Sequence, residues 1–102
     1  MYTYKRWAAG IAATQSVDDL LGLIREYIAT IGPSELSLLP EECRAHRLRD
    51  IDDLAEMAVT FAKCELATDP GAPAYSLLHE MALTFAAAQG RLRIIRGAFP
   101  VG

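Results

Sequence analysis

An acidic run with one histidine is the strongest chemical signal in this sequence. Residues 41–56, EECRAHRLRDIDDLAE, contain Glu42, His46, Asp50 and Asp53 at intervals of three or four residues. On a continuous helix such residues form one row, and carboxylates with an imidazole could ligate a divalent metal. A metal there could polarise a phosphate ester. One hypothesis is therefore a small metal-dependent hydrolase that acts on a phosphorylated metabolite, its site completed by a partner helix.

The same row can equally be the solvated side of a helix. At about 100° per residue, Glu42, His46, Arg49 and Asp53 lie opposite the apolar positions that begin with Leu48. Arg49 and Asp53 form an ordinary i,i+4 ion pair on such a face, and the guanidinium would compete with a metal. We therefore favour the solvated face, and we predict no cofactor.

The last long segment, residues 73–96, is apolar on two sides. The first stripe includes Leu78, Met81, Phe85 and Leu92 and is typical of a core face. The second stripe consists of Leu83, Ala87, Gly90 and Ile94. Glycine costs about 1 kcal/mol relative to alanine inside a helix, and the close approach of another helix would offset that cost. This stripe predicts a homodimer interface; the alternative is that the N-terminal residues cover it.

The elements that must position these residues are helices. Strand patterns are nearly absent, and clusters of glycine and proline divide the chain into helical lengths. We expect a weak helix at 2–14, a helix at 17–31, a short turn at 34–40, and long helices at 41–67 and 73–96. Because a short loop joins the two long helices, they should form an antiparallel hairpin.

This pattern predicts an all-α protein of about four helices in a small bundle. We expect a single domain over residues 1–102, with 1–15 as a loosely docked arm in one alternative. Ser16 is a suitable N-cap for the helix at 17–31, and Asp18 and Asp19 suit its first turn.

The overall composition excludes several classes of protein. Of the 102 residues, 52% are hydrophobic and 23% are charged, which is typical of a folded chain. The net charge of −3 and the scattered basic residues do not favour nucleic-acid binding. No apolar run approaches the roughly 20 residues that span a bilayer, so we expect no membrane contact and a cytoplasmic location. On one continuous helix Cys43 and Cys64 would lie roughly 30 Å apart, which predicts two free thiols.

No motif for a catalytic nucleophile, phosphate loop or zinc hydrolase is present in the sequence. The favoured hypothesis is a non-enzymatic interaction or regulatory module that self-associates through its last helix or binds a protein partner. The alternatives are the metal-dependent hydrolase and a helical pocket for an apolar ligand or partner helix. Such a pocket should be a cleft lined by Met57, Phe61, Met81 and Phe85.

Overall fold

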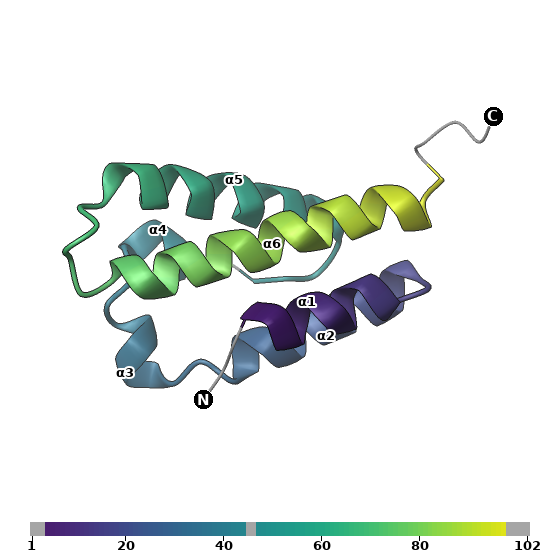
Figure 1. The fold of residues 1–102 in the computed structure, drawn as a ribbon, viewed down its shortest axis with the longest axis horizontal. Coiled ribbons are helices and arrows are strands. Elements are labelled where there is room, and N and C mark those ends of the chain that lie inside the picture. The colour runs from purple at the N-terminus through teal and green to yellow at the C-terminus, as the bar shows by residue number, and fades with distance from the viewer. Residues whose placement is uncertain (1–3, 45–46, 98–102) are drawn as a thin grey trace.

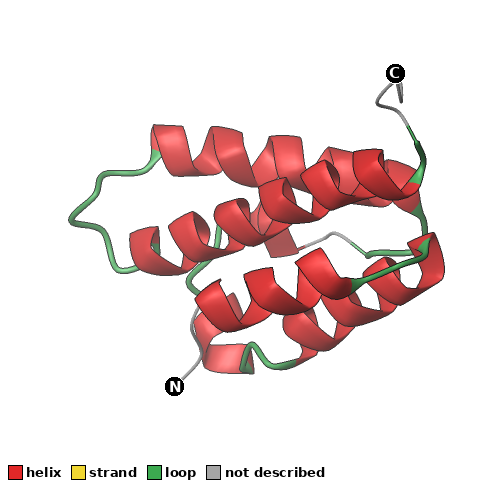
Figure 2. Ribbon diagram, turned by 45° about the vertical axis from the view of Figure 1, so that its right-hand side comes forward, coloured by secondary structure: helices red, strands yellow, loops and turns green. Residues whose placement is uncertain are grey.

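Six helices make up the computed structural model of this chain, which describes residues 4–44 and 47–97 (Figure 1). The described residues contain no strand (Figure 2). The prediction of a small all-α bundle is confirmed. The helices are α1 (Tyr4–Ala13), α2 (Val17–Ala29), α3 (Pro33–Leu36), α4 (Glu41–Arg44), α5 (Ile51–Ala67) and α6 (Tyr75–Ile95).

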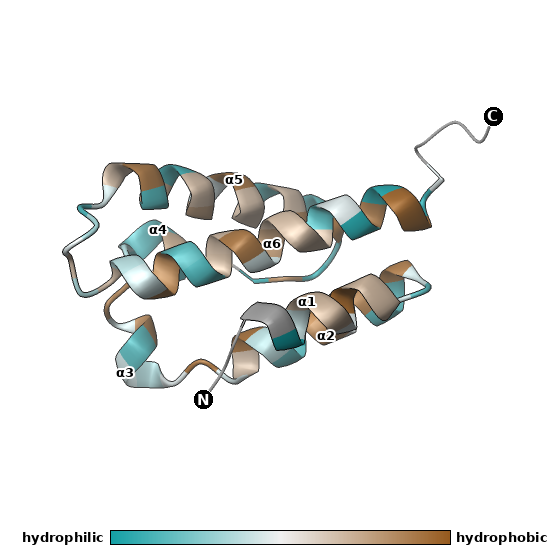
Figure 3. Cartoon of the chain, in the orientation of Figure 1, coloured by the Kyte–Doolittle hydropathy of each residue, from teal (hydrophilic) through white to brown (hydrophobic). Residues whose placement is uncertain are grey.

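Helix α6 is the centre of the bundle. It forms the predicted antiparallel hairpin with α5, and α1 and α2 pack against it on the other side (Figure 1). Hydrophobic residues recur along its length (Figure 3). A chain of edge-to-face aromatic contacts crosses the bundle, with ring centroids 5.3 Å apart for Trp7 and Tyr27, 6.1 Å for Tyr27 and Phe85, and 4.9 Å for Phe61 and Phe85. These rings join α1, α2, α6 and α5 into one core.

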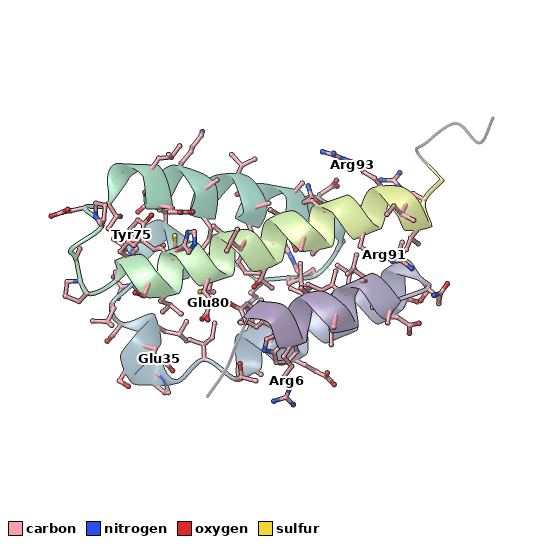
Figure 4. The ribbon with its side chains drawn as sticks, in the orientation of Figure 1. Arg6, Glu35, Tyr75, Glu80, Arg91 and Arg93 are labelled. Carbon is pink, nitrogen blue, oxygen red and sulfur yellow. The ribbon has the colours of Figure 1, made fainter. Side chains whose placement is uncertain are left out.

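Specific hydrogen bonds fix the first two helices. The Ser16 hydroxyl accepts a hydrogen bond from the backbone N–H of Asp19 at 3.1 Å, which is the N-cap expected from the sequence. The Arg91 side chain points from α6 toward the end of α1 (Figure 4). Its Nε and Nη2 donate to the carbonyl oxygen of Thr14 at 2.9 and 2.7 Å. Ile11 is only 2% exposed, so α1 is docked on the core.

The hairpin's first helix, α5, begins at Ile51. The prediction of one continuous helix over 41–67 is therefore wrong. The carboxylate of Asp50 accepts a hydrogen bond from the backbone N–H of Asp53 at 3.0 Å and so caps a new helix. The carboxylate of Asp53 in turn accepts from the backbone N–H of Arg49 at 2.7 Å. These two acidic side chains start a helix where the sequence was expected to continue one.

A long-range contact holds the segment before α5 out of the helical conformation. Arg25 of α2 donates from Nε to the carbonyl oxygen of Leu48 at 2.9 Å and from Nη2 to the carbonyl oxygen of Arg49 at 3.0 Å. In a continuous helix those carbonyls would accept from amides four residues further along the chain. Arg25 thus replaces the missing helical bonds, and Leu48, 8% exposed, enters the core from this segment.

The end of α4 also places Arg44 and Arg47 in solvent. On one continuous helix both side chains would project toward the core, where an unpaired arginine is costly. Both are exposed in the structure because the helix ends at Arg44 and the buried part resumes at Leu48. Within the described ranges, no helix is both long and apolar enough to cross a membrane.

Candidate functional site

A largely apolar pocket of about 450 Å³ lies where α3 and α4 close over the hairpin and the end of α2. Its volume falls within the range of small-molecule sites, roughly 300–1,000 Å³. The polar or titratable groups in its walls belong to Ser37, Cys43 and Arg44. The remaining lining residues are Ile28, Pro33, Leu36, Met57, Phe61 and Met81.

The local sequence explains how α3 closes one side of this pocket. Pro33 occupies the first turn of α3, where its missing N–H has no helical partner to lose. The carboxylate of Glu35 accepts from the backbone N–H of Gly32 at 3.1 Å. These features turn the chain sharply after α2 and bring Leu36 against the core.

The floor of the pocket comes from the hairpin. Met57 and Phe61 lie one turn apart on α5, and Met81 faces them from α6; all three are 3% exposed or less. Methionine side chains are flexible and polarizable, so they adapt to ligands of different shape. Three of the four residues expected to line a cleft therefore do so. The fourth, Phe85, is fully buried between Tyr27 and Phe61 and belongs to the core.

Among the described residues that line the pocket, Arg44 is the only charged one. Its side chain is exposed and forms no ion pair or hydrogen bond with any residue that the structure describes. The hydroxyl of Ser37 donates to the carbonyl oxygen of Ser34 at 2.7 Å, which leaves its own oxygen able to accept. In the part of the chain that the structure describes, the pocket thus combines apolar walls with one positive charge that has no carboxylate partner.

The thiol of Cys43 forms part of the same wall and is 5% exposed. Burial raises its pKa to about 12, with further contributions from hydrogen bonding to Cys64, from the charge of Cys64 and from that of Glu42. Cys43 is therefore a protonated thiol at neutral pH and contributes apolar contact to the wall.

The acidic run does not form a ligand row in the described chain. Glu42 lies exposed on α4, whereas Asp50 and Asp53 lie at the start of α5 and accept the capping hydrogen bonds. Asp53 also pairs with Arg49 at 3.0 Å, and these bonds from Arg49 lower the pKa of its carboxyl group. His46 lies outside the described residues. Among residues 4–44 and 47–97, no three histidine, cysteine, aspartate or glutamate side chains are grouped to hold a metal ion.

The second apolar stripe of α6 remains largely open in the described chain. Leu83 is 38% exposed and Ile94 is 54% exposed. A methyl group added at Gly90 would meet nothing within 4 Å, whereas Ala87 packs partly against the core. Helix α1 packs on α6, and Arg91, one turn after Ala87, donates to the carbonyl oxygen of Thr14, yet Leu83 and Ile94 remain exposed.

A small polar cluster joins the two helices of the hairpin near their connecting loop. The carboxylate of Glu65 accepts from the hydroxyl of Tyr75 at 3.3 Å and lies 2.7 Å from Nδ1 of His79. The rings of Tyr75 and His79 are stacked, with centroids 5.9 Å apart. The cluster contains no activated nucleophile, and the His79 side chain is half exposed. We therefore assign the cluster a structural role, which is to link α5 and α6.

Two carboxylates line a hollow between α3 and α6. Glu35 of α3 and Glu80 of α6 line a hollow of about 270 Å³, and both are visible in Figure 4. Burial, followed by the charge of Glu35, raises the pKa of the Glu80 carboxyl group above its ordinary value.

A larger groove of about 510 Å³ runs between the start of α5 and the end of α6. Its walls carry the carboxylate of Asp52 and the guanidinium groups of Arg93 and Arg96 beside Ile51 and Leu92. The side-chain oxygen of Gln89 is buried there without a hydrogen-bond partner in the described chain. Because the charges of both signs can pair with each other or with water, this groove is less suited to an apolar ligand than the smaller pocket.

No family model, curated protein or solved structure matches this chain.

Sequence reasoning missed the part of the pocket that the end of α2, α3 and α4 contribute, namely Ile28, Leu36, Cys43 and Arg44. Their convergence depends on the break before α5. The signal for that break is the pair Asp50 and Asp53, an acidic cap followed three residues later by a second acid.

Proposed function

We propose that this protein is a non-enzymatic helical module that binds a small ligand with an apolar chain and an anionic head group. The observation that carries the proposal is the pocket of about 450 Å³, whose described lining is apolar except for Ser37, Cys43 and the one charged residue, Arg44. Binding sites for small molecules commonly combine apolar walls with a few polar groups that set orientation.

The two parts of the ligand would meet different parts of the pocket. An apolar chain would contact Met57, Phe61 and Met81, and its removal from water would supply the main driving force. A carboxylate would lie at Arg44, whose guanidinium can donate two parallel hydrogen bonds to it. Since no carboxylate of the described protein neutralises Arg44, the ligand would not have to displace an internal partner.

Calorimetric titration with dodecanoate below its micelle concentration tests this function. We expect saturable binding to the unmodified protein, and on the order of tenfold weaker binding to Arg44→Gln, equivalent to about 1.4 kcal/mol. The matched control is Arg47→Gln, which removes an exposed arginine outside the pocket and should leave the affinity unchanged. Absence of saturable binding, or equal loss in both variants, contradicts the proposal.

Self-association through α6 is a second candidate function, supported by the open stripe at Leu83, Gly90 and Ile94. Two copies that pack these stripes together would bury the exposed Leu83 and Ile94 side chains, and Gly90 would allow their backbones to approach closely. Twofold dimers are the commonest assemblies of soluble oligomers. This dimer would leave the pocket at α3 and α4 accessible, because the two features involve different residues.

Sedimentation equilibrium tests the dimer. The unmodified protein should sediment as a dimer, and Gly90→Glu should sediment as a monomer. The matched control is Gly22→Glu in α2, because a side chain at Gly22 would also meet nothing within 4 Å. A monomer at high concentration for the unmodified protein removes this candidate, and loss of the dimer in the Gly22 variant removes its assignment to α6.

A further inference from the structure

The groove between the start of α5 and the end of α6 carries three charged side chains that have no partner among the described residues. Arg93 and Arg96 lie on the wall that α6 forms, and Asp52 lies in the first turn of α5. Arg93 projects from α6 on the side of α5 (Figure 4). No ion pair or hydrogen bond joins these side chains to one another or to any other residue of 4–44 and 47–97. The groove therefore presents positive charge on one wall and negative charge on the other.

A buried amide of the same groove also lacks a partner. The side-chain oxygen of Gln89 is shielded from solvent and accepts no hydrogen bond from the described protein. A buried polar atom without a partner costs free energy, so such atoms are rare in folded chains. Because Gln89, Arg93 and Arg96 are spaced i, i+4 and i+7 on α6, they form one row along the wall. A ligand in the groove could meet all three.

The floor of the groove is apolar. Leu92 of α6 is 6% exposed, and Ile51 and Ala55 of α5 are partly buried beside it. The volume of about 510 Å³ lies within the range of small-molecule sites. An apolar side chain placed on this floor would be removed from water together with Leu92, which favours binding.

We infer that this groove is a second binding site, which takes a short zwitterionic peptide with an apolar C-terminal residue. The terminal carboxylate would bind Arg93 and Arg96, and the ammonium group would pair with Asp52 on the opposite wall. The peptide N–H would donate to the oxygen of Gln89, and the C-terminal side chain would lie on Leu92. A dipeptide is the shortest peptide that carries all four groups. The inference does not depend on the ligand proposed for the pocket at α3 and α4.

Calorimetric titration of the full chain with glycyl-leucine tests this site. We expect saturable one-to-one binding, and on the order of tenfold weaker binding to Arg93→Gln and to Arg96→Gln, because each loses a charged donor to the carboxylate. The matched control is Arg44→Gln, which removes an arginine from the other pocket and should leave the affinity unchanged. No saturable binding at millimolar dipeptide, or an equal loss in Arg44→Gln, overturns the inference.

An analogue of the dipeptide tests the role of Asp52. N-acetylglycyl-leucine keeps the carboxylate and the peptide N–H but lacks the ammonium group. The unmodified protein should bind it several-fold more weakly than glycyl-leucine, whereas Asp52→Asn should bind the two ligands alike. If the unmodified protein also binds both alike, the groove recognises the carboxyl end of any chain, and the assignment of a free dipeptide is overturned.

The substitution Gln89→Met separates a role in binding from a role in the fold. Methionine has a similar length and helix propensity but no amide oxygen. Because the oxygen of Gln89 has no partner in the described protein, its loss should leave the melting temperature of the free protein unchanged or raise it. The affinity for glycyl-leucine should nevertheless fall several-fold. An unchanged affinity, with or without a fall in melting temperature, overturns the role of Gln89 in the site.

Discussion

Arg25 provides the sharpest test of why the chain breaks before α5. Its guanidinium donates to the carbonyl oxygens of Leu48 and Arg49 at 2.9 and 3.0 Å, from a different helix. Arg25→Met removes both hydrogen bonds and keeps most of the apolar stem of the side chain. The substitution therefore isolates the contribution of the guanidinium group.

The expected loss follows from the surroundings of the two bonds. The bond to Leu48 is partly buried and that to Arg49 is exposed, so the first should be worth about 1 kcal/mol and the second less. We expect Arg25→Met to lower the free energy of unfolding by about 1–2 kcal/mol. For a domain of this size the melting temperature should fall by roughly 5–10 °C.

Urea denaturation followed by circular dichroism measures this change. Arg93→Met is the matched control, because Arg93 is exposed and forms no hydrogen bond with a described residue. Amide hydrogen exchange should also become faster in the first turn of α5 in the Arg25 variant only. If Arg25→Met matches Arg93→Met within about 0.3 kcal/mol, Arg25 does not hold this segment.

Two further substitutions test the cap of α5 and the acidic pair at α6. Asp50→Ala should cost about 1 kcal/mol in urea denaturation, and Asp50→Asn should keep most of that stability; equal losses would rule out the cap. Because the folded chain raises the pKa of Glu80 above 4.5, it holds that proton more tightly than the unfolded chain does. The unmodified protein should therefore lose stability relative to Glu80→Gln as pH rises from below 4.5. If the melting temperatures of the two proteins change with pH by the same amount, this prediction is refuted.

The helices that depend on local signals were predictable from the sequence. Helix α2 begins after Ser16, as expected, because the cap and the acidic first turn lie within a few residues of each other. The hairpin of α5 and α6 followed from its apolar stripes and the proline-rich loop between them. These features require only neighbouring residues, which a single sequence displays directly.

The break before α5 was not predicted, because its causes compete with a strong local pattern. Residues 41–67 are rich in helix formers and keep a helical apolar period beyond Leu48. The pair Asp50 and Asp53 does signal a new start, but it also fits an uninterrupted solvated face. The decisive contact comes from Arg25 on another helix, and no local pattern reveals it.

The same break explains which part of the pocket was predictable. Met57, Phe61 and Met81 lie on the apolar faces of the hairpin, so their convergence followed from the two helices alone. Arg44 reaches the pocket only because α4 ends there and packs back against α5. The separation of roughly 30 Å expected between Cys43 and Cys64 assumed one continuous helix over 41–67, which the structure breaks; both are free cysteines, as expected.

The most direct test of the proposed ligand pocket is to follow the methionine methyl resonances during a dodecanoate titration. Met57 and Met81 both line the floor of the pocket, from α5 and α6 respectively. We predict that both methyl signals shift saturably, with one dissociation constant that agrees with calorimetry and that increases in Arg44→Gln. If both signals stay unchanged at saturating dodecanoate, or shift equally with Arg44→Gln and the unmodified protein, the pocket does not bind an anionic apolar ligand.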